Sequence, residues 1–264
     1  MSSTARAPIG IFDSGMGGLT VLAALRDALP GEDFIYLGDT ARLPYGTKTP
    51  ATVQRYALQA TAALAARGVK AVVVACNTAS GLALDEVAQH HAPLPVYGVV
   101  LPGASEAAAV ADATGVLVLA TESTVKGGAY QRALLAANGR LKIHAHACPL
   151  WVTLAETGSQ SNALVDTILR HDIPTGHPRT VLLGCTHFPV FRRQLEEIFP
   201  ATCFVDSAST TASWVAADLA QRRLLNQRDA GQVTFLATDG VERFRRVGGH
   251  FLGQEIRAVE LVDL

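Results

Sequence analysis

The chain has 264 residues, of which 49% are hydrophobic and 17% charged, and its formal net charge is −1. This composition is typical of one or two folded α/β domains and excludes a disordered chain. The sequence has no basic cluster for nucleic acid, no apolar run of the roughly 20 residues that span a bilayer, and no signal peptide at its start. We therefore expect a cytoplasmic protein that binds neither nucleic acid nor a membrane and is folded apart from residues 1–7.

Short apolar runs alternate with longer Ala/Leu-rich segments along the chain, which predicts an α/β fold with parallel sheets. The expected strands are residues 8–12, 33–38, 70–75, 95–100, 115–119, 141–145, 179–184 and 202–205. Two segments, VVVACNTAS at 72–80 and VLLGCTHFP at 181–189, resemble each other. They predict two similar α/β domains that face each other across a central crevice, where the carboxyl ends of the strands meet. We place the first domain at 1–97 plus 208–264 and the second at 98–207.

The four cysteines stand far apart, without the CxxC spacing of a zinc site. In a reducing compartment they are expected to be free thiols, and we expect no metal site. Cys148 and Cys203 have apolar sequence neighbours and are predicted to belong to the core.

Cys76 and Cys185 each follow an expected strand and precede polar residues. Asn77 and Thr78, together with the start of a helix, are expected to lower the pKa of the Cys76 thiol toward neutrality. A buried structural cysteine is the alternative. Cys185 stands two residues before His187, which could exchange a proton with the thiol or hold its charge. That spacing also suits a cysteine hydrolase with His187 as its base.

The first expected strand is followed by a glycine-rich turn, residues 13–18, whose backbone N–H groups could bind an anion. A dinucleotide site is the obvious candidate, and Asp39 even stands where a ribose-binding acid is expected. However, Thr20 replaces the third glycine of that motif, and Asp13 would repel a pyrophosphate. Ser14 also suits a helix cap, which is compatible with binding of a substrate.

Pro44, Tyr45 and Gly46 predict a rigid turn that points main-chain donors into the same crevice, although a plain surface turn fits equally well. Glu156, Thr121 and Thr124 are weaker candidates, because isolated Glu and Thr residues usually face solvent or cap helices. A pyridoxal route needs a Schiff-base lysine, and none of the four lysines stands at a strand end beside a phosphate site.

Six segments in chain order resemble the successive motifs of glutamate racemases, in the aspartate/glutamate racemase superfamily. The segments are IGIFDSGMGGLTVL, YLGDTARLPYGTKT, VVVACNTAS, YGVVLPGA, VLLGCTHFPVF and VDSA. The tail after about residue 215 carries no such motif.

The resemblance implies a cofactor-independent racemase that supplies D-glutamate for peptidoglycan and is frequently a homodimer. Its paired catalytic thiols correspond to Cys76 and Cys185, and its auxiliary acids to Asp39 and Glu156. The implied substrate contacts are Asp13, Ser14, Tyr45, Gly46, Asn77, Thr78, Thr186 and His187.

Inversion needs a base on one face of the α-carbon and an acid on the other, which two thiols from facing domains would provide. A racemase or decarboxylase for another acid, a Cys–His hydrolase and a non-catalytic binding module remain as alternatives. The module is the weakest, because binding of an amino acid alone requires neither thiol.

Overall fold

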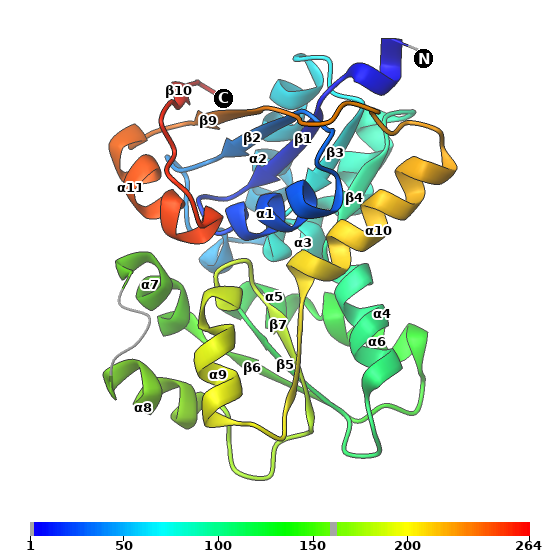
Figure 1. Cartoon of the computed structure of the whole chain (residues 1–264). Coiled ribbons are helices and arrows are strands. Elements are labelled where there is room, and N and C mark those ends of the chain that lie inside the picture. The colour runs from blue at the N-terminus through cyan, green and yellow to red at the C-terminus, as the bar shows by residue number, and fades with distance from the viewer. Residues whose placement is uncertain (1–2, 159–162) are drawn as a thin grey trace.

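The computed structural model describes residues 3–158 and 163–264, which form two α/β domains (Figure 1). The expected fold class is confirmed, since both sheets are entirely parallel. Both chain ends belong to the domain drawn uppermost in Figure 1. In the described ranges, no helix is long and apolar enough to cross a membrane.

The first sheet has six strands in the order β10-β9-β2-β1-β3-β4. Its central strands are short runs of buried residues, the pattern of a sheet covered on both faces. The strands are β1 (Ile9–Asp13), β2 (Phe34–Gly38), β3 (Ala71–Val74), β4 (Val96–Gly98), β9 (Val233–Ala237) and β10 (Glu260–Leu261).

Helices cover both faces of this sheet because successive strand residues point to opposite sides. Ile11 and Val73 pack with α1 (Leu19–Ala28), α10 (Ser207–Gln221) and α11 (Val241–Leu252). Phe12 and Val72 pack on the opposite face with α2 (Pro50–Ala65) and α3 (Asn77–His91).

The second sheet has four strands in the order β6-β5-β7-β8. They are β5 (Val116–Ala120), β6 (Ile143–Ala147), β7 (Thr180–Gly184) and β8 (Cys203–Asp206). One face packs against α4 (Val100–Val110) and α6 (Ala129–Ala137). The other packs against α7 (Pro149–Thr157), α8 (Ala163–Asp172) and α9 (Arg192–Ile198), while α5 (Glu122–Gly127) follows β5. Short 3-10 helices lie at Ser3–Arg6, Tyr45–Thr47 and Phe188–Phe191.

Every expected strand overlaps an observed one, but β9 and β10 were not expected. Both join the far edge of the first sheet, where β9 pairs with β2 and β10 with β9. The chain passes from the first sheet to the second between β4 and β5 and returns between β8 and β9. The domain limits at 97/98 and 207/208 stay a prediction, which we propose from these crossings.

The expectation that residues 1–7 remain unfolded is wrong for the part that the structure describes. Residues 3–6 form a 3-10 helix, and Ala5 is buried. The buried ammonium of Lys70 donates to the carbonyl of Ala5 at 2.7 Å and forms an ion pair with Glu32 at 2.5 Å. This contact fixes the N-terminal segment against the first domain.

Candidate active site

A cavity of about 260 Å³ lies where the carboxyl ends of strands from both sheets meet. Nine of the ten residues expected to form the site line it, and Asp13 does not. The lining residues are Ser14, Pro44, Tyr45, Gly46, Thr47, Cys76, Asn77, Thr78, Thr121, Glu122, Pro149, Val152, Thr153, Cys185, Thr186 and His187.

Cys76 caps the N-terminus of α3, two residues after β3 ends. The helix start was expected to lower the pKa of this thiol, and the expectation is wrong. Burial, together with the negative charge of Asp13, raises the pKa of Cys76 to about 12. Hydrogen bonds from the Ala79 amide and the Ser14 hydroxyl oppose this rise but do not overcome it.

Cys185 follows β7 directly and is also buried. Its Sγ lies 3.8 Å from Nδ1 of His187, within reach of a sulfur hydrogen bond. The two thiols are close enough for charge on Cys185 to raise the pKa of Cys76. One cavity therefore has a thiol from each domain on its wall.

His187 is buried and yet favours its protonated form. Burial alone would lower the pKa of His187, but hydrogen bonds to Cys185 and Glu156 and the charge of Asp13 outweigh it and raise the pKa to about 10. Near neutral pH the imidazolium thus places a positive charge beside Cys185.

Glu156 of α7 holds the other side of the His187 ring. Its Oε1 lies 3.0 Å from Nε2 of His187, and its Oε2 accepts from Arg243 of α11 at 2.5 Å. Burial alone would raise the pKa of Glu156, but these two partners outweigh it and lower the pKa. Phe251, also of α11, packs edge-on against the His187 ring. The tail of the first domain therefore supports a histidine of the second.

Asp13 ends β1 and is fully buried beneath the glycine-rich turn. Its Oδ2 accepts from the Gly15 amide at 2.9 Å, and its Oδ1 accepts from the Thr186 hydroxyl at 3.5 Å. Burial raises the pKa of Asp13, which the positive His187 partly offsets. Asp13 thus joins the first domain to the Thr186–His187 segment from behind the cavity wall.

The sequence was compared with known proteins. The family model for Asp/Glu/Hydantoin racemase matches residues 17–214. A protein of Geobacter metallireducens named glutamate racemase is 44% identical over 97% of this chain and 96% of its own length. The chain belongs to the Asp/Glu/Hydantoin racemase family. It is therefore an enzyme of the racemase type.

Solved structures in this racemase family have the same fold. Glutamate racemase of Francisella tularensis, in complex with D-glutamate, superposes with a TM-score of 0.91 at 34% identity, covering 98% of each chain. Glutamate racemase isoform RacE1 of Bacillus anthracis gives 0.93 at 32% identity, with the same coverage.

Asn77 of this racemase lines the cavity, and only one end of its side-chain amide is hydrogen-bonded within the described residues. Its Nδ2 donates to the Tyr130 hydroxyl at 2.6 Å and to the Ser207 hydroxyl at 3.1 Å. Its buried Oδ1 has no hydrogen-bond partner in the described part of the chain. A buried acceptor without a partner is costly, so Oδ1 is prepared for a donor from a ligand.

Three threonine hydroxyls form a triangle beside the cavity. Oγ1 of Thr78 lies 3.0 Å from Oγ1 of both Thr121 and Thr124, which are 2.9 Å apart. The weaker candidates Thr121 and Thr124 thus meet the predicted site residue Thr78.

Tyr45 and Gly46 also line the cavity, from the short 3-10 helix Tyr45–Thr47. The Tyr45 hydroxyl donates to Oδ2 of Asp39 at 2.5 Å, and Nε of Arg42 donates to the same oxygen at 2.7 Å. A Cβ on Gly46 would lie 2.8 Å from Cβ of Thr121, so glycine permits this close approach of the two domains. Asp39 is buried and does not line the cavity.

The prediction that Cys148 and Cys203 belong to the core is confirmed for Cys148, which is fully buried in the hydrophobic cluster that includes Trp151, and is wrong for Cys203. Cys203 is exposed at the start of the edge strand β8. Cys148 is buried but lies beside the polar side chains of His146 and Asp172.

Sequence reasoning missed Arg243, Tyr130 and Ser207. Arg243 stands in a tail without a recognisable motif, and its role depends on α11 packing beside the second domain. Tyr130 and Ser207 were also missed because their role depends on the fold. Each forms a hydrogen bond with Asn77, which is more than 50 residues away in the sequence.

Proposed function

We propose that this enzyme is a cofactor-independent glutamate racemase that inverts the α-carbon between Cys76 and Cys185. One observation carries the proposal: a buried thiol at the strand ends of each of two sheets lines a single small cavity. The names of the full-length relatives support glutamate as the substrate. The D-glutamate in the Francisella tularensis structure supports it further.

In the proposed reaction, one thiolate removes the α-proton and the opposite thiol delivers a proton to the other face. The C–H bond breaks toward one sulfur while a new C–H bond forms from the other, so the enzyme ends with its thiolate and thiol exchanged. No redox step occurs. The developing negative charge must be stabilised by donors aimed at the substrate carboxylate. The hydroxyls of Thr78 and Thr186 and the start of α3 supply such donors.

The protonated His187 places its positive charge 3.8 Å from Sγ of Cys185, the thiol proposed to act as the base on L-glutamate. Burial, together with the negative charge of Asp13, raises the pKa of Cys76, so Cys76 is a thiol near neutral pH. The α-ammonium of a bound amino acid would oppose the charge of Asp13 and lower the pKa of Cys76. The substrate itself would thus help to activate the first-domain thiol.

The ammonium group also has a partner, because Oδ1 of Asn77 lacks a donor. Tyr45, Gly46 and Thr121 lie on the same cavity and are proposed to bound the side-chain carboxylate. Ser14 and Asp13 are proposed as further substrate contacts. Asp13 would act electrostatically, since it lies behind the wall.

We further propose that the enzyme acts in the cytoplasm as a homodimer and supplies D-glutamate for peptidoglycan. The homodimer and the supply of D-glutamate rest on the resemblance of the motifs, and the location rests on the sequence expectation given above.

The test is incubation of the purified enzyme with L-glutamate in D₂O without any added cofactor. The α-carbon should acquire deuterium while optical rotation falls to zero, because the incoming proton comes from a solvent-exchanged thiol. Racemisation that depends on added pyridoxal phosphate would overturn the proposal. Release of CO₂, or hydrolysis of amide substrates without inversion, would instead favour the decarboxylase or the hydrolase.

A parallel assay with aspartate tests the substrate. A shorter acid leaves cavity donors unpaired at a cost of about 1–3 kcal/mol each. Equal kcat/KM for aspartate would assign the enzyme to another member of the family.

A further inference from the structure

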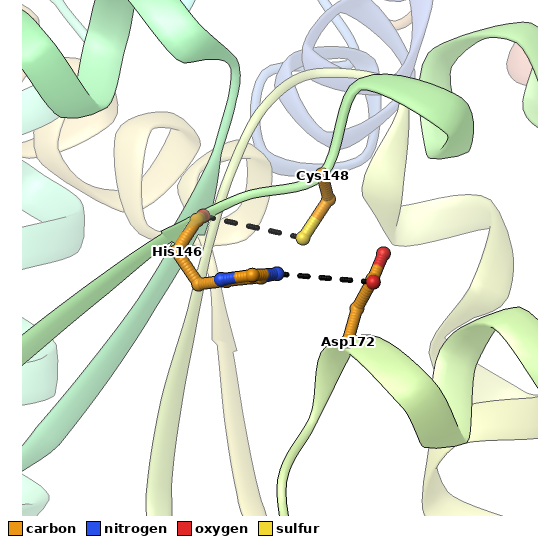
Figure 2. Close-up of side chains that lie close together, drawn as sticks. All are labelled: His146, Cys148 and Asp172. Atoms are coloured by element: carbon orange, nitrogen blue, oxygen red, sulfur yellow. Dashed lines mark hydrogen bonds and ion pairs between the residues drawn. The ribbon is translucent and has the colours of Figure 1, made fainter.

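A second group of chemically reactive side chains lies outside the cavity, at the far edge strand of the second sheet. His146 belongs to β6, Cys148 caps the start of α7, and Asp172 ends α8. One nitrogen, one sulfur and one oxygen atom of these residues all lie within 4.8 Å of one another. Figure 2 shows the three side chains pointing toward a common centre.

The carboxylate of Asp172 is held in place by a neighbour. Nε1 of Trp151 donates to Oδ2 at 2.8 Å, and Trp151 is fully buried. Oδ1 faces Nε2 of His146 at 3.7 Å and Nδ1 of His171 at 2.9 Å. In the described ranges, the ion pairs of Asp172 are with these two histidines rather than with Lys or Arg.

The combination of thiolate, imidazole and carboxylate is a zinc ligand set. Magnesium and calcium prefer oxygen ligands, so the sulfur of Cys148 argues against them. Neighbouring ligand atoms of tetrahedral zinc stand roughly 3.3–3.5 Å apart for bond lengths of about 2.0–2.3 Å. The distance of 3.7 Å between Nε2 of His146 and Oδ1 of Asp172 is close to this separation.

His146 is the ligand that must move for all three ligand atoms to reach zinc-binding distances. The His146 side chain is 48% exposed, so rotation can bring its ring toward Cys148 without disturbing the core. Cys148 and Asp172 are fixed, the first by burial and the second by Trp151. A carboxylate that is hydrogen-bonded through its second oxygen is a common way to orient a metal ligand.

We propose that His146, Cys148 and Asp172 bind one Zn²⁺ ion, with water in the fourth position. Binding forms a Zn–S bond to Cys148 and releases the thiol proton to solvent, with no redox change. The site departs from our expectation of no metal, which rested on the lack of CxxC spacing. Here the ligands come from a strand, a helix start and a helix end, so no short motif marks them.

The proposed ion would lie beside the helix that supports His187. Cys148 immediately precedes α7, and α7 carries Glu156, the partner of His187. Pro149, Val152 and Thr153 of the same helix line the cavity. The site is nevertheless separate, because none of its three ligands lines that cavity.

Cobalt is the probe for the test, because Co²⁺ bound to a thiolate absorbs by charge transfer. The catalytic thiols and the exposed Cys203 are first removed in the full chain as Cys76→Ser, Cys185→Ser and Cys203→Ser, which leaves Cys148 as the sulfur ligand. One equivalent of Co²⁺ should produce the thiolate band, and Zn²⁺ should displace it stoichiometrically.

Substitution of the proposed zinc ligands in the same triple Cys→Ser variant decides whether they bind the metal. His146→Ala changes an exposed side chain, so folding is preserved, and it should weaken Co²⁺ binding by at least about 10–100-fold. Cys148→Ser should abolish the band. His144→Ala is the matched control, since His144 lies two residues earlier on the same strand and is also exposed. Absence of the band, or equal binding by His146→Ala and His144→Ala, would overturn the site.

Discussion

The carboxylate of Glu156 lies 3.0 Å from Nε2 of His187, on the ring edge opposite the Cys185 thiol. A negative charge in this place favours the imidazolium and fixes which nitrogen faces the sulfur. Glu156 lies behind the cavity lining, so it acts as a positioning residue through His187.

Glu156→Gln should lower the pKa of His187 from about 10, by about one unit or more, because the neighbouring negative charge is lost. We expect a lower kcat for L-glutamate with little change in KM. NMR titration of the His187 ring measures the first effect. Glu122→Gln is the control for the titration, since Glu122 is an exposed acid whose ion-pair partner is Lys126. An unchanged His187 pKa in Glu156→Gln would contradict the assigned role.

The raised pKa of His187 also predicts how stability depends on pH. The folded-state pKa is about 10, above the ordinary value of 6.5, so the folded state holds the proton more tightly. The resulting stabilisation is complete below pH 6.5 and is lost as pH rises through about 10. The Tm advantage of the wild type over His187→Gln should therefore shrink across this interval. His144→Gln, a substitution of an exposed histidine outside the site, is the control.

Arg243→Ala should hold the Glu156 carboxylate less firmly, because it removes the guanidinium group that donates to Oε2. The Arg243 side chain is 46% exposed, so we expect a loss of about 1 kcal/mol, or roughly fivefold in kcat. Arg243→Lys should restore part of the rate, because it keeps the charge but not the planar donor geometry. Steady-state kinetics of Arg246→Ala, an exposed neighbour on the same helix, provide the control. A similar loss in that variant would assign the effect to α11 as a whole.

Gly17→Ala should reduce activity by about 100-fold, the effect of misplacing a catalytic group by roughly 1 Å. A Cβ at this position would collide with the imidazole of His187 and lie 2.5 Å from Oγ1 of Thr186. Gly15→Ala is the matched control in the same turn, where the nearest atom, of Leu43, lies at an ordinary 3.4 Å. Racemase assays and Tm values of both variants separate lost activity from lost folding. Equal activity of the two variants would show that activity does not depend on the close approach of Gly17 to His187 and Thr186.

Replacement of either thiol by Ala should abolish racemisation in both directions, because each direction uses both. The two variants should differ with a glutamate analogue that only needs α-deprotonation before it loses a leaving group. By the resemblance to glutamate racemases, Cys76 is expected to deprotonate D-glutamate and Cys185 L-glutamate. Cys76→Ala should therefore still eliminate from the L-analogue, and Cys185→Ala from the D-analogue. The opposite pattern would exchange the two assignments. Near wild-type racemisation by Cys76→Ala would refute the two-thiol mechanism.

Local sequence was sufficient to predict the strands that carry the catalytic candidates. The runs before Cys76 and Cys185 are apolar and end in polar residues, because buried parallel strands end at a ligand crevice. The strand β9 was missed because only its last two residues, Leu236 and Ala237, are buried. Its pairing with β2, about 200 residues earlier, is a long-range contact that a local pattern does not contain.

The electrostatics of the site could not be predicted in the same way. A helix start beside Cys76 suggested a lowered thiol pKa, but complete burial and the carboxylate of Asp13 have the larger effect. Asp13 was assigned to the site by its position in the turn, whereas its place behind the cavity wall follows from packing. Contacts such as Arg243 to Glu156 join residues 87 positions apart, so they required the fold.

The order of the strands has a consequence for synthesis of the chain on the ribosome. The strand β9 pairs with β2 and belongs to the first sheet, although the whole second sheet is made before it. During translation the edge of β2 therefore stays open until β9 emerges, and Arg243 follows later still. A nascent chain can thus carry both thiols and His187 while it lacks the cation that holds Glu156, so the full rate should be reached only after α11 has emerged.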